Sequence, residues 1–532
     1  MERLKQLIAL AVVAQHVDAV TFTVPSKVGT GDFTYAPLDP APVGISFEFF
    51  AFPSYFSNVT ATNQCLANWK DLTGMWPPIR IGGTTQDRAS FDASTSAYVV
   101  YSVATPADAP KTLTFGPKFM TLAGTYPGRV VVGLNRGKNN IDNTIAAAKV
   151  AVKEIPNLLA IELGNEPECE SHCMEIANRA NKPPDYPKDG QPIASGTWNP
   201  SVDATSQINW NIRVGSALGK TNIIQAGNWN QAPPEWGAAQ LIAKENATAK
   251  QYVRHYAHHN YPGGSIQKLQ THSQTASNIR QFDADVAAVK REGKEYVLGE
   301  TNSGSSLLSA SPFLRPFPQC TPLPPLLITL ANSHRGKVSG GGATNVSPTF
   351  GAALWTLDYI LLSLSHSISR VYFHHGTVGN CQYCFFGRYS MGAPYWGAHT
   401  AVSFLAGGKH IAALDDGRSN YAAYAVFDDQ GRVSRVLVYN SDYYTGSGNR
   451  GKESFVLTGL VDAEGKRVRA KRLTARSALS RADRGDDVRF GGQWFGNGTC
   501  VVGGEEVVEE GTVQGGRVQI EVGASEAVLV YL

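Results

Sequence analysis

Short apolar runs alternate with helix-like stretches along most of this chain, and this alternation constrains its fold more than any other feature. Eight runs with strand character lie at residues 43–47, 79–81, 129–134, 158–163, 222–226, 252–258, 296–298 and 369–373. Stretches with helical periodicity separate some of them, at 143–154, 279–291 and 349–365. Such alternation is typical of parallel βα units, and eight strands predict a (β/α)8 barrel as the simplest closed architecture. An open doubly wound sheet is disfavoured, because no glycine-rich phosphate loop follows the first run.

The pattern changes after about residue 401. Short strand-like runs separated by glycine-rich turns follow at 422–427, 433–439, 454–457, 468–473 and 527–532. This spacing predicts an antiparallel β-sandwich over residues 401–532, after a barrel over 43–400. A further strand-like run at 20–24 leads us to expect that residues 20–42 pack on the sandwich.

Residues 1–19 have the features of a secretory signal peptide. Arg3 and Lys5 precede the apolar run 7–14, and small residues around Ala19 offer a cleavage site. The alternative is a buried N-terminal helix. Glycosylation sequons beginning at Asn58, Asn246 and Asn497 agree with export. Because no later segment reaches about 18 uncharged apolar residues, we expect a secreted, extracellular protein that has no membrane partner.

Charge and cysteine usage narrow the function classes further. A net charge of +3 does not suggest a nucleic-acid partner. The basic stretch 466–472 favours a solvated strand face over a polyanion site. Disulfides are the default reading of the seven cysteines in an exported chain, although their pairing does not follow from the sequence. A zinc or redox site at Cys381 and Cys384 is therefore disfavoured.

Residues 304–337 do not fit a barrel unit. The segment is rich in Ser, Leu and Pro, contains no Asp or Glu, and has no usable periodicity. We hypothesise that it is a translated, unspliced intron, since its codons are pyrimidine-rich like intron ends; the alternative is a substrate-covering loop. Sequencing of the spliced transcript tests this, because mature mRNA that encodes the segment would refute the intron hypothesis.

Two glutamates follow strand-like runs and carry the functional prediction. The run 158–163 leads into Asn165-Glu166-Pro167, and the run 296–298 leads into Glu300. The carboxyl ends of barrel strands meet at one face, so we expect both carboxylates there. A glycosidase needs one carboxyl group to protonate the leaving oxygen and another to attack the sugar. An isolated Asn-Glu-Pro triplet is more often a helix or turn start, but the second Glu-bearing strand favours the catalytic reading.

These motifs resemble clan A barrel glycosidases, which carry the acid/base after strand four and the nucleophile after strand seven. More narrowly, the chain is similar to glycoside hydrolase family 79, which contains secreted β-glucuronidases and, more distantly, heparanase. The resemblance rests on segments spread between about residues 43 and 400, at 44–50, 80–83, 258–261, 299–303, 340–343 and 350–355.

The resemblance implies a role for each matching residue. Glu166 would be the acid/base and Glu300 the nucleophile, with an acidic pH optimum. Asn165 would hydrogen-bond the sugar 2-hydroxyl, and Tyr261 would orient Glu300. No metal or organic cofactor is implied.

Recognition of the sugar carboxylate falls, by the same resemblance, to Gly340, Gly341 and Tyr383. Glu48 matches a substrate-contacting glutamate of the family. A plain flexible turn at the glycines and a surface acid at Glu48 are the alternatives. The pair His258 and His259 is assigned no chemistry.

The sequence as a whole predicts a retaining exo-β-glucuronidase that releases terminal glucuronic acid, or its 4-O-methyl form, from glycans such as arabinogalactan-type proteoglycans. The alternatives are an endo-acting, heparanase-like enzyme, another clan A β-glycosidase, and a non-catalytic carbohydrate-binding or cell-wall protein. The oligomeric state stays open.

Overall fold

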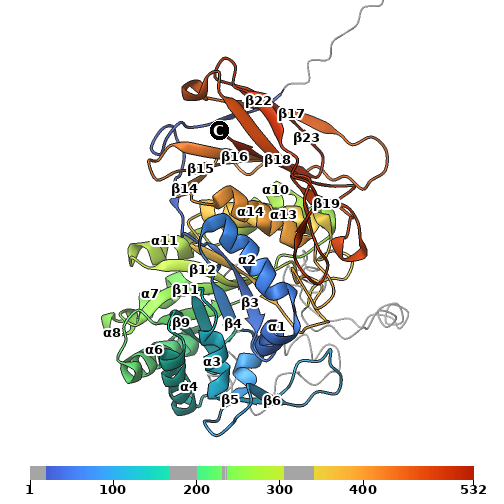
Figure 1. Ribbon diagram of the computed structural model, residues 1–532. Coiled ribbons are helices and arrows are strands. Elements are labelled where there is room, and N and C mark those ends of the chain that lie inside the picture. The colour runs from blue at the N-terminus through green and yellow to red at the C-terminus, as the bar shows by residue number, and fades with distance from the viewer. Residues whose placement is uncertain (1–18, 168–199, 231–233, 235, 305–340) are drawn as a thin grey trace, which may run out of the picture.

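The computed structural model describes residues 19–167, 200–230, 234, 236–304 and 341–532. A barrel occupies one end of the molecule and a body of β-sheets the other (Figure 1). Three sequence predictions fall outside the described residues: the signal peptide up to residue 18, almost all of the 304–337 segment, and Gly340.

Eight parallel strands close into a barrel in the order β10-β11-β12-β13-β3-β4-β8-β9, which confirms the predicted fold class. Their bounds are β3 Val43–Glu48, β4 Ile79–Gly82, β8 Val130–Leu134, β9 Leu158–Leu163, β10 Ile224–Trp229, β11 Val253–Asn260, β12 Glu295–Thr301 and β13 Arg370–His375. Each strand overlaps one of the eight predicted runs. The strands are buried along nearly their whole length, and this is why they appear in the sequence as apolar runs rather than as alternating patterns.

Helices surround the barrel and separate it from the sheets above (Figure 1). Their bounds are α1 Phe52–Asn58, α2 Ala61–Thr73, α3 Pro117–Gly124, α4 Ile141–Glu154, α6 Pro200–Leu218, α7 Ala238–Lys244, α8 Ala247–Lys250, α9 Ile266–Gln270, α10 His272–Arg280, α11 Asp283–Arg291, α13 Phe350–Ser365 and α14 Pro394–Leu405. Every residue of α13 is buried, because this helix packs against other barrel helices and against strand β14 (His410–Ala413) of the upper sheets. No helix in the described ranges is long and apolar enough to cross a membrane.

Two sheets pack face to face in the C-terminal part, as the sequence predicts. The larger contains β2 Ala36–Pro37, β14 His410–Ala413, β15 Tyr421–Phe427, β16 Val433–Asn440, β18 Arg467–Ala475, β19 Val488–Phe490, β22 Glu509–Thr512 and β24 Glu526–Tyr531. The smaller contains β1 Val20–Thr23, β17 Lys452–Thr458 and β23 Val518–Gly523. Phe22, Phe455 and Val438 come from the two sheets and share one hydrophobic core, which makes the pair a sandwich.

Small sheets complete the structure. The strands β5 Ala89–Phe91, β6 Val99–Tyr101 and β7 Leu113–Phe115 form a three-stranded sheet between β4 and α3. The strands β20 Trp494–Phe495 and β21 Val502–Gly503 form a separate pair. Between them, Cys500 is joined by a disulfide to Cys65 of α2, so a covalent bond ties the sandwich to the barrel across 435 residues of sequence.

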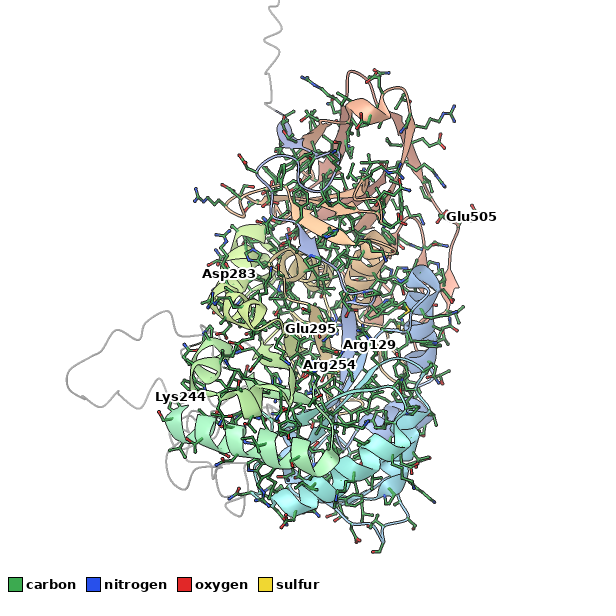
Figure 2. The ribbon with its side chains drawn as sticks, turned by 90° about the vertical axis from the view of Figure 1, so that its left-hand side faces the viewer. Arg129, Lys244, Arg254, Asp283, Glu295 and Glu505 are labelled. Atoms are coloured by element: carbon green, nitrogen blue, oxygen red, sulfur yellow. A yellow bond between two sulfur atoms is a disulfide. The ribbon has the colours of Figure 1, made fainter. Side chains whose placement is uncertain are left out.

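An ionic cluster closes the barrel at the N-terminal ends of its strands. Arg370 donates to Asp39 at 2.8 Å and to Glu295 at 2.6 Å, and Arg129 also donates to Asp39. Arg129, Glu295 and Arg254 are marked at this end in Figure 2. In barrel enzymes this end contributes stability, whereas the opposite end carries the active site.

A second buried cluster joins the barrel to the sandwich. His272 of α10 contacts Asp358 of α13 at 2.9 Å through Nδ1 and Asp415 at 2.8 Å through Nε2. Burial alone would lower the pKa of His272, but the two carboxylates outweigh burial and raise the pKa to about 10. This histidine is therefore a buried cation between two acids at the interface of the two domains.

Candidate active site

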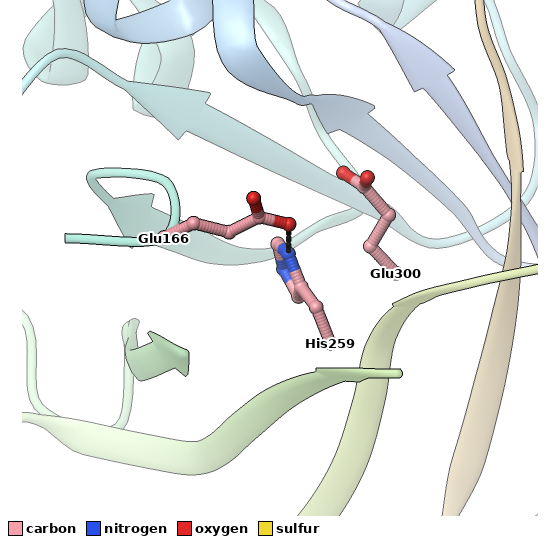
Figure 3. A group of neighbouring side chains, drawn as sticks. All are labelled: Glu166, His259 and Glu300. Carbon is pink, nitrogen blue, oxygen red and sulfur yellow. Dashed lines mark hydrogen bonds and ion pairs between the residues drawn. The ribbon is translucent and has the colours of Figure 1, made fainter. Parts of the chain in front are cut away.

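The structure brings Glu166 and Glu300 together at the C-terminal ends of the barrel strands. Glu300 lies within β12, and Glu166 follows the end of β9 by three residues. A carboxylate oxygen of each lies within 4.8 Å of the other (Figure 3). The two residues are only 9 % and 6 % exposed, respectively. The carboxylates therefore face each other in a largely dry site.

Glu166 adopts a backbone conformation that non-glycine residues rarely adopt. Its φ is 46°, in the left-handed region. Its backbone N–H donates to the Asn228 carbonyl at 3.0 Å, and the N–H of Asn165 donates to an Asp87 carboxylate oxygen at 2.6 Å. These bonds hold the strained turn after β9, as is common where a side chain must be aimed at a functional site.

Glu300 is surrounded by donors and positive charge. The Tyr261 hydroxyl donates to Oε1, Arg80 donates to Oε2, and the His374 Nδ1 lies 3.6 Å from Oε2. Burial alone would raise the pKa of Glu300, but His374, Arg80 and the Tyr261 hydroxyl lower it well below its ordinary value. Glu300 is therefore ionised across the ordinary pH range.

Arg80 connects the site to the barrel core. It makes two hydrogen bonds to Glu162, one of them at 2.9 Å from Nε, and it also donates to Asn165 Oδ1 at 3.1 Å and Ser46 Oγ at 3.0 Å. The glutamates raise its pKa despite its complete burial, so it stays charged. The guanidinium thus fixes the positions of Glu300 and Asn165 relative to each other.

Glu166 has the opposite electrostatics. Burial first, and then the negative charge of Glu300, raise the pKa of Glu166 to about 8. Its Oε1 lies 2.8 Å from Nδ1 of His259, whose own pKa burial lowers to about 4. At neutral pH one group is therefore a protonated acid and the other a neutral imidazole.

His259 contacts Glu166 directly, although the sequence predicts no chemistry for this residue. Its neighbour His258 packs between Trp229 and Phe282, with ring centroids at 6.2 Å and 5.2 Å, as a core residue would. Successive residues of a strand point to opposite faces. His259 lies near the carboxyl end of β11, and this position was the one feature of the sequence that could have predicted its contact with Glu166.

His374 is the residue that sequence reasoning missed altogether. Its Nε2 lies 3.3 Å from Glu48 Oε2, and its Nδ1 lies 3.0 Å from Ser46 Oγ and faces Glu300. Burial alone would lower the pKa of His374, but Glu300 and Glu48 raise it above its ordinary value. A cationic imidazole thus stands between two carboxylates. Its place at the end of the last barrel strand was the only indication in the sequence.

Glu48, predicted to contact substrate, is held by protein groups in this structure. Its Oε1 accepts from the Thr85 backbone N–H at 2.9 Å and hydroxyl at 2.5 Å, while Oε2 faces His374. The residue is 8 % exposed. Glu48 lies at the site, as predicted. It also contacts His374, which in turn lies next to Glu300, so the three side chains form a row of alternating charge.

Tyr383 and Gly341, predicted to recognise a sugar carboxylate, lie beside each other. The Tyr383 ring is 6.1 Å from that of Tyr261 and 6.3 Å from that of His374. The backbone N–H of Tyr383 donates to the Gly341 carbonyl at 3.2 Å. These residues line the same side of the site as the contacts of Glu300.

Glu166, His259 and Glu300 are also residue types that bind metal ions, and their ligand atoms cluster within 4.8 Å. Arg80 and His374 already place positive charge on Glu300, and Glu166 carries a proton near neutral pH. A divalent cation would have to displace that proton and face two cations. The cluster is therefore better suited to proton transfer than to metal binding.

Three of the five basic residues in the run 466–472 pair with nearby acids. Arg472 donates to Glu509 at 2.8 Å, Arg467 lies 3.7 Å from Glu510, and Lys471 pairs with Glu506. The acids come from β22 and the residues just before it, next to β18. These pairs reduce the excess positive charge of the run, which agrees with the solvated strand face that the sequence predicts.

Comparisons with known proteins agree with this geometry. A family described as the glycosyl hydrolase family 79 C-terminal beta domain matches residues 423–529. A β-glucuronidase of Aspergillus niger is 29% identical over 438 residues, which are 75% of this chain and 71% of that protein. A β-glucuronidase of Neurospora crassa is 26% identical over 452 residues, 76% of this chain and 70% of that protein.

Solved structures extend the similarity over nearly the whole chain. A 4-O-α-L-rhamnosyl-β-D-glucuronidase from Fusarium oxysporum, in complex with Rha-GlcA, is 45% identical with a TM-score of 0.83, covering 96% of this chain and 100% of that one. An α-L-arabinofuranosidase from Thermotoga maritima, 11% identical with a TM-score of 0.58, covers 97% of this chain and 99% of that one, and shares the fold alone.

Proposed function

Because the chain belongs to glycoside hydrolase family 79, we propose that it is a secreted, retaining exo-β-glucuronidase. Its substrate is a glycan or proteoglycan that ends in β-linked glucuronic acid or its 4-O-methyl form. The observation that carries the proposal is the closeness of the two carboxylates, which have oxygens within 4.8 Å of each other. Retaining enzymes hold their carboxyl groups about 5–5.5 Å apart, whereas inverting enzymes leave about 6.5–9.5 Å for a water.

In the first step, the Glu300 carboxylate attacks the anomeric carbon and forms a glycosyl ester. The bond to the leaving oxygen breaks as Glu166 gives that oxygen its proton. The opposite pKa shifts of the two glutamates match these roles, because the acid must be protonated and the nucleophile ionised.

In the second step, the Glu166 carboxylate takes a proton from water. The resulting hydroxide equivalent attacks the anomeric carbon, and Glu300 leaves as a carboxylate. Arg80, Tyr261 and His374 stabilise that returning negative charge, since all three already face the Glu300 oxygens.

We assign the remaining site residues to substrate recognition. Asn165 accepts from Arg80 through Oδ1, which leaves its Nδ2 to donate to the sugar 2-hydroxyl. Tyr383, with Gly341 and Gly340, would receive the sugar carboxylate, and Glu48 would accept from a sugar hydroxyl.

A second candidate function follows from the similarity to the Fusarium enzyme. Its 45% identity over 96% of this chain exceeds that of both fungal β-glucuronidases. In this reading the enzyme would accept α-L-rhamnose on O4 of the glucuronic acid and release the disaccharide. Both candidates use the same two glutamates and differ only in the space around O4.

The test uses p-nitrophenyl β-glucuronide and its 4-O-rhamnosyl derivative as substrates for the purified protein, with Glu300→Gln as the control. Release of nitrophenol from either substrate, abolished in the control, supports the glucuronidase assignment. The ratio of kcat/KM for the two substrates decides between the candidates. Release from neither would refute both.

Export, glycosylation and splicing concern the form in which the cell makes this protein. We propose that residues 1–19 are removed on export, which agrees with the exposure of all three sequon asparagines, Asn58, Asn246 and Asn497. We propose domain boundaries at 20–42, 43–400 and 401–532. Mass spectrometry of the secreted protein tests the N-terminus and the glycans. Parallel assay of a variant that lacks 304–337, beside transcript sequencing, tests the intron hypothesis.

A further inference from the structure

A disulfide links Cys381 and Cys384 in the loop that follows β13, and the mechanism above does not use it. The bond closes a ring of four residues that contains Gln382 and Tyr383. Tyr383 is 3 % exposed, whereas Cys381 is partly exposed. The disulfide therefore encloses a buried aromatic residue in a loop at the rim of the barrel.

The side chain of Tyr383 faces the catalytic centre. Its ring lies 6.1 Å from that of Tyr261 and 6.3 Å from that of His374, and both of these residues approach Glu300. Burial first, and then the negative charges of Glu300 and Glu48, raise the pKa of Tyr383 well above its ordinary value. The phenol therefore stays protonated and can donate a hydrogen bond in the site.

The backbone of the ring is clamped to the glycine segment. The Gly341 carbonyl accepts from the N–H of Gln382 at 2.6 Å and from that of Tyr383 at 3.2 Å. Gly342 has a φ of 94°, and a Cβ at this position would lie 2.8 Å from Cδ1 of Tyr383. A side chain here would therefore push the tyrosine out of place.

Further contacts hold one side of the ring against the barrel. The Tyr55 hydroxyl lies 3.4 Å from the Cys384 sulfur and donates to the Gly376 carbonyl at 3.0 Å. Asn302, two residues after Glu300, donates to the Tyr383 carbonyl at 3.3 Å. These contacts fix the position of Cys384, and the disulfide in turn restrains Cys381, which lies on the more exposed side of the loop.

We propose that the Cys381–Cys384 disulfide positions Tyr383 for binding of the substrate carboxylate, and so sets the affinity for uronides. This inference rests on the proposed glucuronidase function. A merely stabilising role fits the geometry less well. In the chain-entropy account, a cross-link three residues apart stabilises a fold far less than one 435 residues apart, such as Cys65–Cys500.

The two disulfides of the described chain provide a matched pair of variants. In Cys381→Ser/Cys384→Ser, we expect KM for p-nitrophenyl β-glucuronide to rise about tenfold while kcat stays within about twofold, because the weakened contact is made equally in the ground state and the transition state. Its Tm should change little. In Cys65→Ser/Cys500→Ser we expect the reverse, with a lowered Tm and an unchanged KM. An equal KM in the parent and the Cys381→Ser/Cys384→Ser variant would overturn the proposal.

Tyr383→Phe tests the same idea with the disulfide intact. If the ring acts through Tyr383, this variant raises KM similarly, and adding it to Cys381→Ser/Cys384→Ser raises KM no further. Additive effects, or no effect of Tyr383→Phe, would refute the role. Iodoacetamide labelling with mass spectrometry checks that the bond forms in the parent, and free thiols there would also refute it.

Calorimetric binding of free glucuronate separates failure of this inference from failure of the proposed function. If the parent binds glucuronate but hydrolyses no glucuronide, the proposed activity is refuted. The role of the disulfide is then tested by the Kd for glucuronate in the parent and in the variant. A Kd that is equal in the parent and the Cys381→Ser/Cys384→Ser variant refutes the inference whatever the activity is. A parent that neither binds glucuronate nor hydrolyses a glucuronide refutes both.

Discussion

Replacement of His374 by glutamine removes one positive charge from the catalytic pair and keeps a polar side chain of similar reach. The imidazole Nδ1 lies 3.6 Å from Glu300 Oε2, and its Nε2 lies 3.3 Å from Glu48. At an effective dielectric constant of about 20, a unit charge 3.6 Å away contributes about 5 kcal/mol, or about three pKa units, as an upper bound. Solvent and the new amide group will reduce this value.

The sign of the effect is the same for both glutamates. The loss of a cation destabilises a carboxylate, so the pKa of Glu300 rises from its depressed value and that of Glu166 rises from about 8. Glu300 must be ionised to attack, so the acid limb of kcat/KM moves to higher pH. Glu166 must be protonated to donate, so the basic limb moves in the same direction. We expect the acid limb to rise by about two to three pH units.

The assay is kcat/KM for p-nitrophenyl β-glucuronide from about pH 2.5 to 9.5. His375→Gln is the matched control, because burial and the charge of His374 lower the pKa of His375 well below its ordinary value and keep it neutral. It accepts from the Phe385 N–H at 3.1 Å, so its loss costs stability without moving either limb. A His374→Gln profile that superimposes on that of the parent would show that His374 carries no charge in the site.

Four further predictions follow from the same contacts. In the parent, kcat/KM should be flat through weakly acidic pH and fall above about pH 8, where Glu166 ionises; a profile still rising at pH 9 would refute its role as the acid. Glu166→Ala should lose activity most on substrates with poor leaving groups, and azide should rescue it with formation of a β-glucuronyl azide, detected by mass spectrometry; its absence would argue against retention. Tyr261→Phe should lower kcat/KM about tenfold or more, because Glu300 loses the hydrogen bond from the Tyr261 hydroxyl. The matched control Tyr359→Phe loses hydrogen bonds from Asn260 at 2.8 Å and Thr301 at 2.9 Å and should lower only Tm. Equal kinetics in the two variants would refute the role of Tyr261 at Glu300. His272→Ala should lower the free energy of unfolding by about 3–5 kcal/mol, since two buried acids lose their cation. In the parent, the stability that protonated His272 contributes is fully present below pH 6.5 and is lost as the pH rises through about 10. Denaturant unfolding curves measured across this pH range should show that this pH dependence is absent from the variant.

The sequence predicted the secondary structure best where the burial of an element gives its residues a regular apolar pattern. All eight barrel strands overlap predicted runs, because a parallel strand buried on both faces requires an apolar sequence. The sandwich strands were predicted from short strand-like runs and glycine-rich turns, and the segment before the barrel places an edge strand on each sheet of the sandwich. The contact of Tyr261 with Glu300 was expected only from the family resemblance.

Other features arise from packing between distant segments, which leaves no local pattern. The pairing of Cys65 with Cys500 depends on where α2 meets the loop between β20 and β21. The basic run 466–472 has an excess of charge in the sequence, but the sheet places β22 and its acids against it.

The sequence by itself determined the barrel, the sandwich and the two glutamates, because each is written in contiguous residues at the end of a predictable strand. Only the tertiary structure decided the protonation states of those glutamates. Burial and the charge of Glu300 raise the pKa of Glu166, whereas His374 on β13 and Arg80 on β4 lower that of Glu300, and all of these groups approach through space from other strands. A pKa reflects the field of all surrounding charges, and that field exists only once the barrel has closed.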